Sequence, residues 1–392
     1  MIQNVTLKKF LKGTVCKLVT CANKVLPKSD AIVLLYMGNK GIGFNLAPLY
    51  DYLITNGYNK NYHIVCSVES EKYYGEAKEN VTYVNHIGGL KYFLRAKHVF
   101  YTAGQLPIKP SNKQIVIHMN HGITDYKTVG ALTKINNGDE FYFTYMIASS
   151  PLYVPIIAKE YLCKAENIKI CNEPMTERII KPQNKYDLGT YSKILLWVPT
   201  FRQSDYLGYD DSSIEAITPL YEDKDYDGLN AILKKHNFLI IVKLHPSQST
   251  DKYKQIMFSN LKIYSHQDFV ETGMNLYDLM AQVDGLIGDY SSASLQFLLT
   301  EKPQAFVIPD FEEYKEKRGF VFDNPRDYMP GHLIYDKCGF EEFLNDFANG
   351  IDPYREKRKK VKAMIHTYDD TNSCKRLLDL SKIYRSGDGQ NA

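Results

Sequence analysis

Four clusters of polar residues follow predicted buried strands, and their residue types suit chemistry on a phosphorylated substrate. His121-Gly122 ends the segment QIVIHMNHG. A histidine can remove a proton from a hydroxyl near neutral pH, and the glycine lets the backbone approach a ligand closely. Lys243 and His245 alternate at the end of FLIIVKLHP, where both can face one phosphate. Arg202 follows a third strand, and its planar guanidinium suits bidentate phosphate binding.

The fourth cluster is the turn DYSS at residues 289–292, between a predicted strand at 285–288 and a predicted helix. Ser291 or Ser292 is the expected N-cap, because a serine hydroxyl accepts from the free N–H groups of a helix start. Those N–H groups and the positive end of the helix dipole favour an anion. The stretch predicts a phosphate site, although an ordinary, well-capped strand–helix turn explains it equally well.

Each of these residues taken alone has an ordinary structural explanation. A histidine at a strand end can cap a backbone carbonyl, Lys243 can be a surface lysine, and Arg202 can be half of a salt bridge. Together they follow several strands, at the edge where open α/β sheets bind ligands. This combination favours a phosphorylated or nucleotide-linked substrate held between two domains.

The elements that position these clusters form an α/β pattern. From Ala31 onward, short apolar strands alternate with amphipathic helices, which predicts doubly wound, parallel sheets. A polar, turn-rich segment at residues 181–193 precedes a fresh apolar strand, and 392 residues exceed one typical core. We therefore predict a basic N-terminal segment at 1–30, a first Rossmann-like domain at 31–182 and a second at 183–392, with helices at its end.

Composition excludes several classes of protein. The chain is 44% hydrophobic and 24% charged, as expected of a globular protein, and its net charge of +3 is too small to indicate nucleic-acid binding. Seven cysteines without a C-x-x-C pair indicate thiols in a reducing cytoplasm. No apolar run approaches the roughly 20 residues that span a bilayer.

Residues 1–29 carry six lysines and no acidic residue, with an imperfect apolar stripe. Such a helix can lie on an anionic membrane, or it can pack on its own domain with a solvated basic face. A metal site has less support. The sequence Asp225-Tyr226-Asp227 is similar to the Asp-x-Asp of one glycosyltransferase class, but it precedes a helix, so we expect Asp227 to be the N-cap.

The order of these motifs resembles the CDP-glycerol glycerophosphotransferase family of teichoic-acid primases and polymerases. The resemblance runs from about residue 31 to 382 and implies a GT-B-like fold, two facing Rossmann-like domains with a cleft between them. The segments that carry it are 121–130 (HGITDYKTVG), 199–202 (PTFR), 243–246 (KLHP), 289–292 (DYSS) with 302–303 (KP), 318–319 (RG), 328–331 (YMPG) and 369–376 (DDTNSCKR).

The resemblance also implies roles for individual residues. His121 would deprotonate the acceptor hydroxyl, which attacks the β-phosphorus of a CDP-alcohol and releases CMP. The donor would be bound by residues of the second domain: Arg202, Lys243, His245, Asp289, Ser291, Ser292 and Gln296. Gly122, Lys127 and Arg318 would serve the acceptor or another part of the site. No cofactor or metal is implied, and a requirement for a divalent cation stays open.

The implied partners are CDP-glycerol or CDP-ribitol, a lipid-linked or capsular glycan acceptor, and the inner face of the cytoplasmic membrane, where the protein would be peripheral. Three departures from the family pattern leave the alcohol open. Asn120 stands where the family often has tryptophan, Ile123-Thr124 replaces Thr-Pro, and Gln296 replaces an aspartate.

Two other functions fit the same clusters. A GT-B glycosyltransferase would use a nucleotide sugar and release UDP or GDP in place of CMP. A non-catalytic subunit would bind a CDP-alcohol tightly without turnover, although His121 argues against it.

Overall fold

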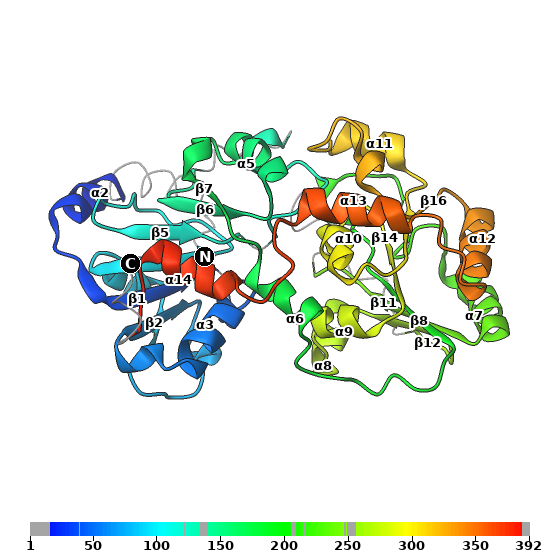
Figure 1. The fold of residues 1–392 in the computed structure, drawn as a ribbon, viewed down its shortest axis with the longest axis horizontal. Helices are drawn as coiled ribbons and strands as arrows, with labels where there is room; N and C mark the ends of the chain where they lie inside the picture. Colours follow the sequence, from blue (N-terminus) through cyan, green and yellow to red (C-terminus); the bar gives the residue numbers. More distant parts are fainter. Residues whose placement is uncertain are drawn as a thin grey trace. The chain divides into compact units, whose positions relative to one another are not determined.

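The computed structural model describes residues 16–38, 40–120, 122–133, 140–204, 209–214, 216–246, 248 and 256–385. The chain forms two compact units, and each contains a seven-stranded sheet (Figure 1). Unit 1 comprises Met1–Ile123, Asn137–Met175 and Asp370–Ala392, and unit 2 comprises Thr124–Asn136 and Thr176–Asp369. The predicted α/β class is confirmed.

The sheet of unit 1 is parallel throughout. Its spatial order is β3-β2-β1-β4-β5-β6-β7, so the first strand lies inside the sheet and the chain winds outward from it on both sides. The strands are β1 (Ser29–Met37), β2 (His63–Val68), β3 (Val81–Asn85), β4 (Ala96–Thr102), β5 (Ile115–His118), β6 (Tyr145–Ala148) and β7 (Ile168–Ile170).

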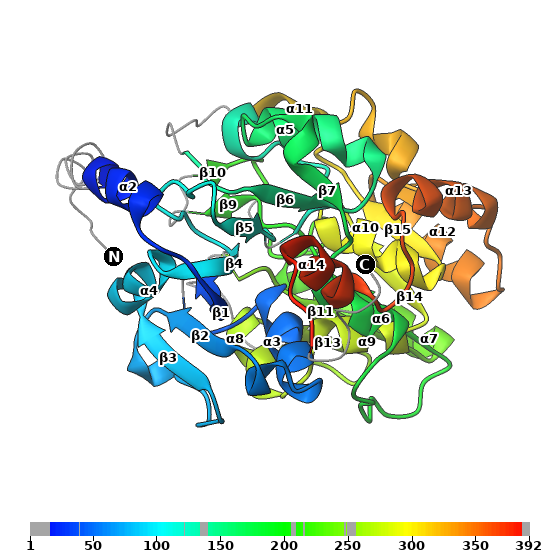
Figure 2. The same cartoon turned by 60° about the vertical axis from the view of Figure 1, so that its left-hand side comes forward.

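Both faces of this sheet are buried, because alternate residues of a strand point to opposite faces. Val33 and Leu35 of β1 belong to one core cluster, while Leu34 and Tyr36 belong to another. Helices α3 and α14, which lie side by side, supply leucines to the first cluster, and α4 supplies Phe93 to the second (Figure 2). The helices of unit 1 are α2 (Cys16–Val25), α3 (Leu46–Thr55), α4 (His86–Phe93), α5 (Val154–Glu160) and α14 (Ser373–Ser381).

Unit 2 repeats this arrangement. Its sheet has the order β12-β13-β11-β8-β14-β15-β16, and only the edge strand β12 is antiparallel to its neighbour. The strands are β8 (Lys193–Trp197), β11 (Phe238–Lys243), β12 (Ile256–Met257), β13 (Leu261–Tyr264), β14 (Gly285–Gly288), β15 (Gln304–Val307) and β16 (His332–Ile334), with a separate ribbon of β9 (Gln203–Ser204) and β10 (Tyr209–Asp210).

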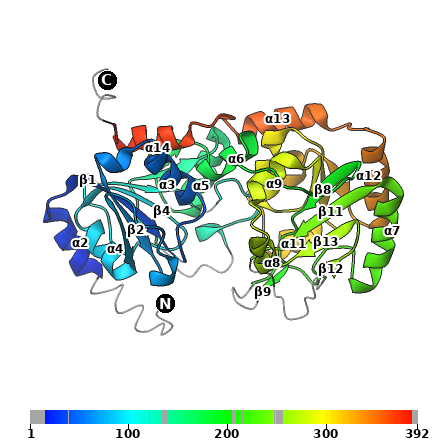
Figure 3. The same ribbon diagram turned by 90° about the horizontal axis from the view of Figure 1, so that it is seen from below.

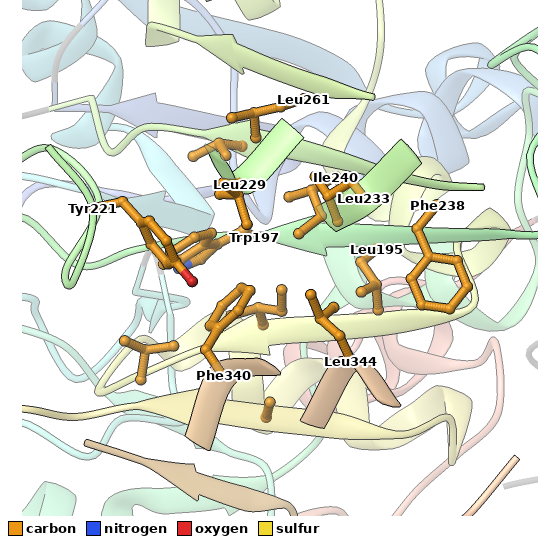
Figure 4. Close-up of a cluster of buried hydrophobic side chains, with 14 of the residues drawn as sticks. Leu195, Trp197, Tyr221, Leu229, Leu233, Phe238, Ile240, Leu261, Phe340 and Leu344 are labelled. Atoms are coloured by element: carbon orange, nitrogen blue, oxygen red, sulfur yellow. The ribbon is translucent and has the colours of Figure 1, made fainter. Parts of the chain in front are cut away.

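Helices cover both faces of the second sheet (Figure 3). On one face, Trp197 of β8 packs with Leu229 of α7 and Phe340 of α12 (Figure 4). On the other face, Leu196 lies in a cluster with Leu279 of α9. The helices of unit 2 are α6 (Glu177–Ile180), α7 (Tyr226–His236), α8 (His266–Glu271), α9 (Leu276–Gln282), α10 (Ser292–Phe297), α11 (Phe311–Lys317), α12 (Lys337–Ala348) and α13 (Arg355–Ile365).

The division into units differs from the sequence-based division at 182 in two respects. The boundary between the units lies between Met175 and Thr176. In addition, residues 124–136 belong to unit 2 and residues 370–392 belong to unit 1, although each lies next to the other unit in the sequence. The end of the chain joins unit 1, because Leu377 and Leu378 of α14 enter its core and Arg376 Nε donates to the Cys171 carbonyl at 2.9 Å. An amphipathic pattern predicts that a helix face is buried, but it does not say against which sheet.

The N-terminal segment is described from Cys16, and residues 1–15 lie outside the described part. The inner face of α2 packs on its own unit: Asn23 is fully buried and donates to Gln114 Oε1 at 2.7 Å, while Lys28 Nζ donates to Asn23 Oδ1 at 2.7 Å. The outer face exposes Leu18 and Val25. Among the described helices, none is both long and apolar enough to cross a membrane.

Candidate active site

The central feature of unit 2 is a buried ion-pair network at the carboxyl end of its sheet. The chain leaves β8 in one direction toward β11 and later returns to β14 on the other side, so the sheet order reverses between β8 and β14. Open α/β sheets bind ligands at such a reversal. Arg202 follows β8, Asp289 follows β14, and their side chains are only 3% and 1% exposed.

Arg202 holds this edge of the sheet together. Its Nη1 binds the Asp289 carboxylate and also donates to the Thr200 carbonyl at 2.8 Å. Its Nε donates to Asp310 Oδ2 at 3.0 Å and its Nη2 to Asp310 Oδ1 at 3.3 Å. Asp310 follows β15, so one arginine joins the ends of three adjacent strands.

The electrostatics of this network follow from burial and proximity. Burial alone would raise the pKa of Asp310, but the Arg202 guanidinium outweighs it and holds that pKa below its ordinary value. Burial likewise disfavours the charged form of Arg202, and the two carboxylates reverse this and raise its pKa. Tyr290 Oη donates a further bond to Asp310 Oδ1 at 3.0 Å. Asp310 and Arg202 are therefore both charged near neutral pH.

This geometry changes the interpretation of Arg202 and Asp289. All three guanidinium nitrogens bind protein oxygens, and the side chain is enclosed, so Arg202 presents no open face to a donor phosphate. Asp289 is also committed, since it accepts from Thr200 N at 2.9 Å, Thr200 Oγ1 at 2.7 Å and Ser291 N at 3.1 Å. Sequence reasoning missed Asp310, although it follows a strand just as Asp289 does.

The network fixes the turn at residues 289–292. Ser291 is the N-cap of α10 and its Oγ accepts from Ala293 N at 3.3 Å, which confirms the predicted cap. Ser291 and Ser292 are half-buried, so their hydroxyls can reach a ligand. Gln296, one turn further along α10, is 3% exposed.

Lys243 and His245 lie at the end of β11, the strand that pairs with β8 on the side opposite β14. Burial lowers the pKa of Lys243 to about 8, and its Nζ lies 5.9 Å from the centre of the Phe269 ring. The described residues include no carboxylate within 4 Å of this ammonium group. The half-buried His245 ring lies 4.7 Å from the ring of Phe201. A half-buried ammonium group and a half-buried imidazole at a sheet edge suit an anionic ligand.

Lys127 and Arg318 lie together on another part of unit 2, because the segment after the His-Gly motif binds along residues 318–321. Thr128 Oγ1 donates to the Arg318 carbonyl at 2.9 Å, and Lys127 forms a β-bridge with Phe320. Arg318 Nη1 lies 3.4 Å from Asp211 Oδ2, and Lys127 Nζ lies 4.0 Å from Asp125 Oδ1. Their side chains are 10% and 14% exposed.

The motif segment is anchored more firmly at Tyr126. Its fully buried side chain donates from Oη to the Tyr328 carbonyl at 2.7 Å, and its own carbonyl accepts from Val321 N at 2.8 Å. The residues that follow the His-Gly motif therefore bind the RG and YMPG segments that were identified in the sequence. His121, the expected base, lies outside the described residues, and Gly122 belongs to unit 1.

The described residues contain no group of three side chains arranged to hold a metal ion. The predicted N-cap at Asp227 is wrong: α7 begins at Tyr226, and Asp225 occupies the N-cap position. Asp225 instead closes a capping box with Glu222 and pairs with Lys337 Nζ at 2.8 Å. These contacts give the Asp225-Tyr226-Asp227 sequence a structural role.

Sequence comparisons with known proteins found a matching family and several related proteins. Residues 18–381 match the family described as CDP-Glycerol:Poly(glycerophosphate) glycerophosphotransferase. A teichoic acid glycerol-phosphate primase of Bacillus subtilis (strain 168) is 28% identical, over 60% of this chain and 57% of that protein. A teichoic acid ribitol-phosphate primase of Bacillus spizizenii (strain ATCC 23059 / NRRL B-14472 / W23) is 27% identical, over 62% and 61%. The chain thus spans less than two thirds of the length of these two relatives.

The fold is also similar to that of a solved protein. The structure of the wall teichoic acid polymerase TagF matches with a TM-score of 0.72 and 18% identity, over 97% of this chain and 95% of that chain. Together with the two Rossmann-like sheets, this confirms the GT-B-like class.

Proposed function

Because the chain belongs to the CDP-Glycerol:Poly(glycerophosphate) glycerophosphotransferase family, we propose that it transfers glycerol phosphate, or a related polyol phosphate, from a CDP-alcohol to a hydroxyl of a cell-envelope or capsule glycan. The structural observation that carries this proposal is the Arg202–Asp289–Asp310 network, which fixes a serine turn at the reversal point of the second sheet. TagF, which shares the fold, has been solved as a variant with CDPG.

The donor is held by the half-buried side chains of this edge, which solvent can reach. Lys243 and His245 supply positive charge and hydrogen-bond donors to the CDP pyrophosphate, and Ser291 and Ser292 supply hydroxyls. Arg202 and Asp289 are positioning residues that keep the serine turn in place. Because phosphoryl transfer develops charge on phosphate oxygens, fixed cations and donors supply most of the catalysis.

The reaction is a direct displacement at the β-phosphorus. His121 accepts the proton of the acceptor hydroxyl, the oxygen forms a bond to the β-phosphorus, and the bond to the bridging oxygen breaks. CMP leaves with that oxygen, and the alcohol phosphate becomes a phosphodiester of the acceptor. Lys127 and Arg318 serve the acceptor side, and Gln296 contributes to the choice between CDP-glycerol and CDP-ribitol.

The exposed face of α2 supports a peripheral position at the inner face of the cell membrane, near a lipid-linked acceptor. Leu18 and Val25 are 72% and 77% exposed, and Lys17 and Lys24 are exposed beside them. Apolar side chains flanked by lysines bind anionic bilayers through burial and charge. Flotation with liposomes, with and without anionic lipid, tests this. A Leu18→Asp variant that floats as well as the parent protein would contradict it.

The activity is tested by CMP release. The protein, CDP-glycerol or CDP-ribitol and an extracted glycan acceptor should yield CMP, and His121→Ala should abolish the release. Unchanged turnover in His121→Ala would remove the proposed base. Release of UDP or GDP from a panel of nucleotide sugars would favour the glycosyltransferase, and tight CDP-alcohol binding without turnover would favour the binding subunit.

A further inference from the structure

The phenylalanine that precedes Arg202 is held on both sides by the ion-pair network of unit 2. Thr200 donates to Asp289 from its backbone N at 2.9 Å and from Oγ1 at 2.7 Å. Arg202 is bound to the carboxylates of Asp289 and Asp310. Phe201 lies between these two anchored residues and is itself buried, with 6% of its surface exposed. Its backbone is therefore fixed relative to the ends of β8, β14 and β15.

The backbone of His245 is fixed separately, at the end of β11. Leu244 N donates to the Tyr264 carbonyl at 3.0 Å, and the Leu244 side chain is buried. On the other side, the His245 carbonyl accepts from Gln248 N at 3.0 Å, which closes a turn. Pro246 is the second residue of this turn, a position that suits the fixed φ of proline. The histidine therefore lies between a strand end that is bound to β13 and a closed turn.

The two rings meet between these fixed backbones. The centroids of the Phe201 and His245 rings lie 4.7 Å apart, with an angle of 45° between the ring planes. Aromatic rings attract each other at such separations and prefer tilted or offset arrangements. A ring contact uses the face of an imidazole, whereas the hydrogen bonds of an imidazole lie in its plane. Phe201 can therefore limit the rotation of His245 without competing for the ring nitrogens.

We propose that Phe201 is a positioning residue that sets the orientation of the His245 imidazole for the donor pyrophosphate. The proposal rests on the proposed function, in which His245 supplies a hydrogen-bond donor to a CDP-alcohol. A side chain that becomes ordered only when a ligand binds weakens the affinity, and a side chain that is already ordered avoids this cost. The Arg202 network thus acts on both parts of the donor edge: it fixes the serine turn directly, and it fixes His245 through Phe201.

A direct contact between Phe201 and the donor is the alternative role. Phe201 offers a ligand little surface, because it is 6% exposed, whereas His245 is half-buried. The two roles differ in a double-mutant cycle, which measures whether one residue acts through another. A residue that acts through His245 affects donor binding only while His245 is present, whereas a residue that touches the donor affects binding in either background.

Calorimetry of CDP-glycerol binding provides this cycle. His245→Ala should weaken binding about 10–100-fold. Phe201→Leu, which keeps apolar bulk and removes the ring, should weaken binding about 2–10-fold, because His245 must then become ordered when the donor binds. Adding Phe201→Leu to His245→Ala should cause less than about a twofold further loss. An unchanged affinity in Phe201→Leu, or an equal further loss in the His245→Ala background, would overturn the proposal.

Phe347→Leu is a matched control for the loss of a buried ring. Phe347 is also 6% exposed, and its ring centroid lies 5.8 Å from that of Phe238, the first residue of β11. This variant should lose stability in urea but keep the parent affinity for CDP-glycerol. Phe201→Tyr, which keeps a ring beside His245, should bind within about twofold of the parent. An equal loss of affinity in Phe347→Leu and Phe201→Leu would overturn the proposal, because general loss of packing would explain both.

A second readout needs neither donor nor activity. The Phe201 ring shifts the NMR signals of protons close to it. In protein with labelled histidine, the His245 signal, identified by its loss in His245→Ala, should therefore move in Phe201→Leu toward its position in urea. An unchanged signal would overturn the proposal.

If Phe201→Leu fails to fold, the parent protein provides the test. A nuclear Overhauser contact between the ring protons of Phe201 and His245 is then the expected result, and its absence would overturn the proposal. Absence of CDP-glycerol binding by the parent protein would instead contradict the proposed function.

Discussion

Removing the Arg202 side chain should destabilise unit 2 far more than removing an exposed cation. In Arg202→Met, Asp289 and Asp310 stay buried, 1% and 3% exposed at their side chains, and lose their cation. Leaving a buried charge without its partner costs about 3–5 kcal/mol. Lys359→Met is a matched control, because its ion pair with Glu356 is exposed and contributes little to stability.

The chain provides its own probe for this measurement. It has a single tryptophan, and Trp197 is buried in the core of unit 2, so its fluorescence during urea unfolding reports on that unit alone. Extrapolation to zero urea should give a free energy of unfolding about 3–5 kcal/mol lower in Arg202→Met than in the parent. A loss as small as that of Lys359→Met would refute the view that this network stabilises the serine turn.

The destabilisation of unit 2 by Arg202→Met should also depend on pH in a defined direction. In the parent, Arg202 lowers the pKa of Asp310, so this contribution is complete above the unfolded value near 3.8 and disappears as the pH falls below it. In Arg202→Met, Asp310 keeps the hydrogen bond from Tyr290 but loses the guanidinium, so burial becomes the dominant influence and raises its pKa, and protonation stabilises the variant as the pH falls. The difference in free energy of unfolding between parent and variant should therefore become smaller from pH 7 to pH 4. A difference that grows over this range would contradict the assigned electrostatics.

Three further changes test other parts of the site. Lys243→Met should weaken CDP-glycerol binding about 10–100-fold, as measured by calorimetry. The affinity of the parent protein should fall as the pH rises through about 8, where Lys243 loses its proton. An affinity that does not change with pH would contradict the role of Lys243. Tyr126→Phe should cost about 1 kcal/mol in the same fluorescence assay and lower kcat, whereas Tyr221→Phe, whose buried hydroxyl has no partner among the described residues, should be nearly neutral. Gln296→Asp should change the ratio of kcat/KM for CDP-glycerol and CDP-ribitol, and an unchanged ratio would remove Gln296 from donor selection.

The sequence predicts the architecture of this chain well, because buried strands and helix caps are local signals. The strand at residues 285–288 and the N-cap at Ser291 are found where expected. The sequence also identifies Arg202 and Asp289, but it does not predict that each is enclosed by the other. That outcome depends on Asp310, which is distant in sequence and adjacent only because β14 pairs with β15.

The path of one segment could not be predicted for a similar reason. Residues 124–136 follow strands of the first sheet but join unit 2 through Tyr126 and Thr128, whose partners are backbone carbonyls near residues 318 and 328. Backbone acceptors leave no mark in a sequence.

The central claim is that the transferred group is an alcohol phosphate. Phosphorus NMR of the acceptor after incubation with CDP-glycerol tests this most directly. A new phosphodiester resonance on the glycan, formed in equal amount to CMP, is the predicted result. A glycan that gains a sugar from a nucleotide sugar, with release of UDP or GDP and no new phosphodiester, would contradict it.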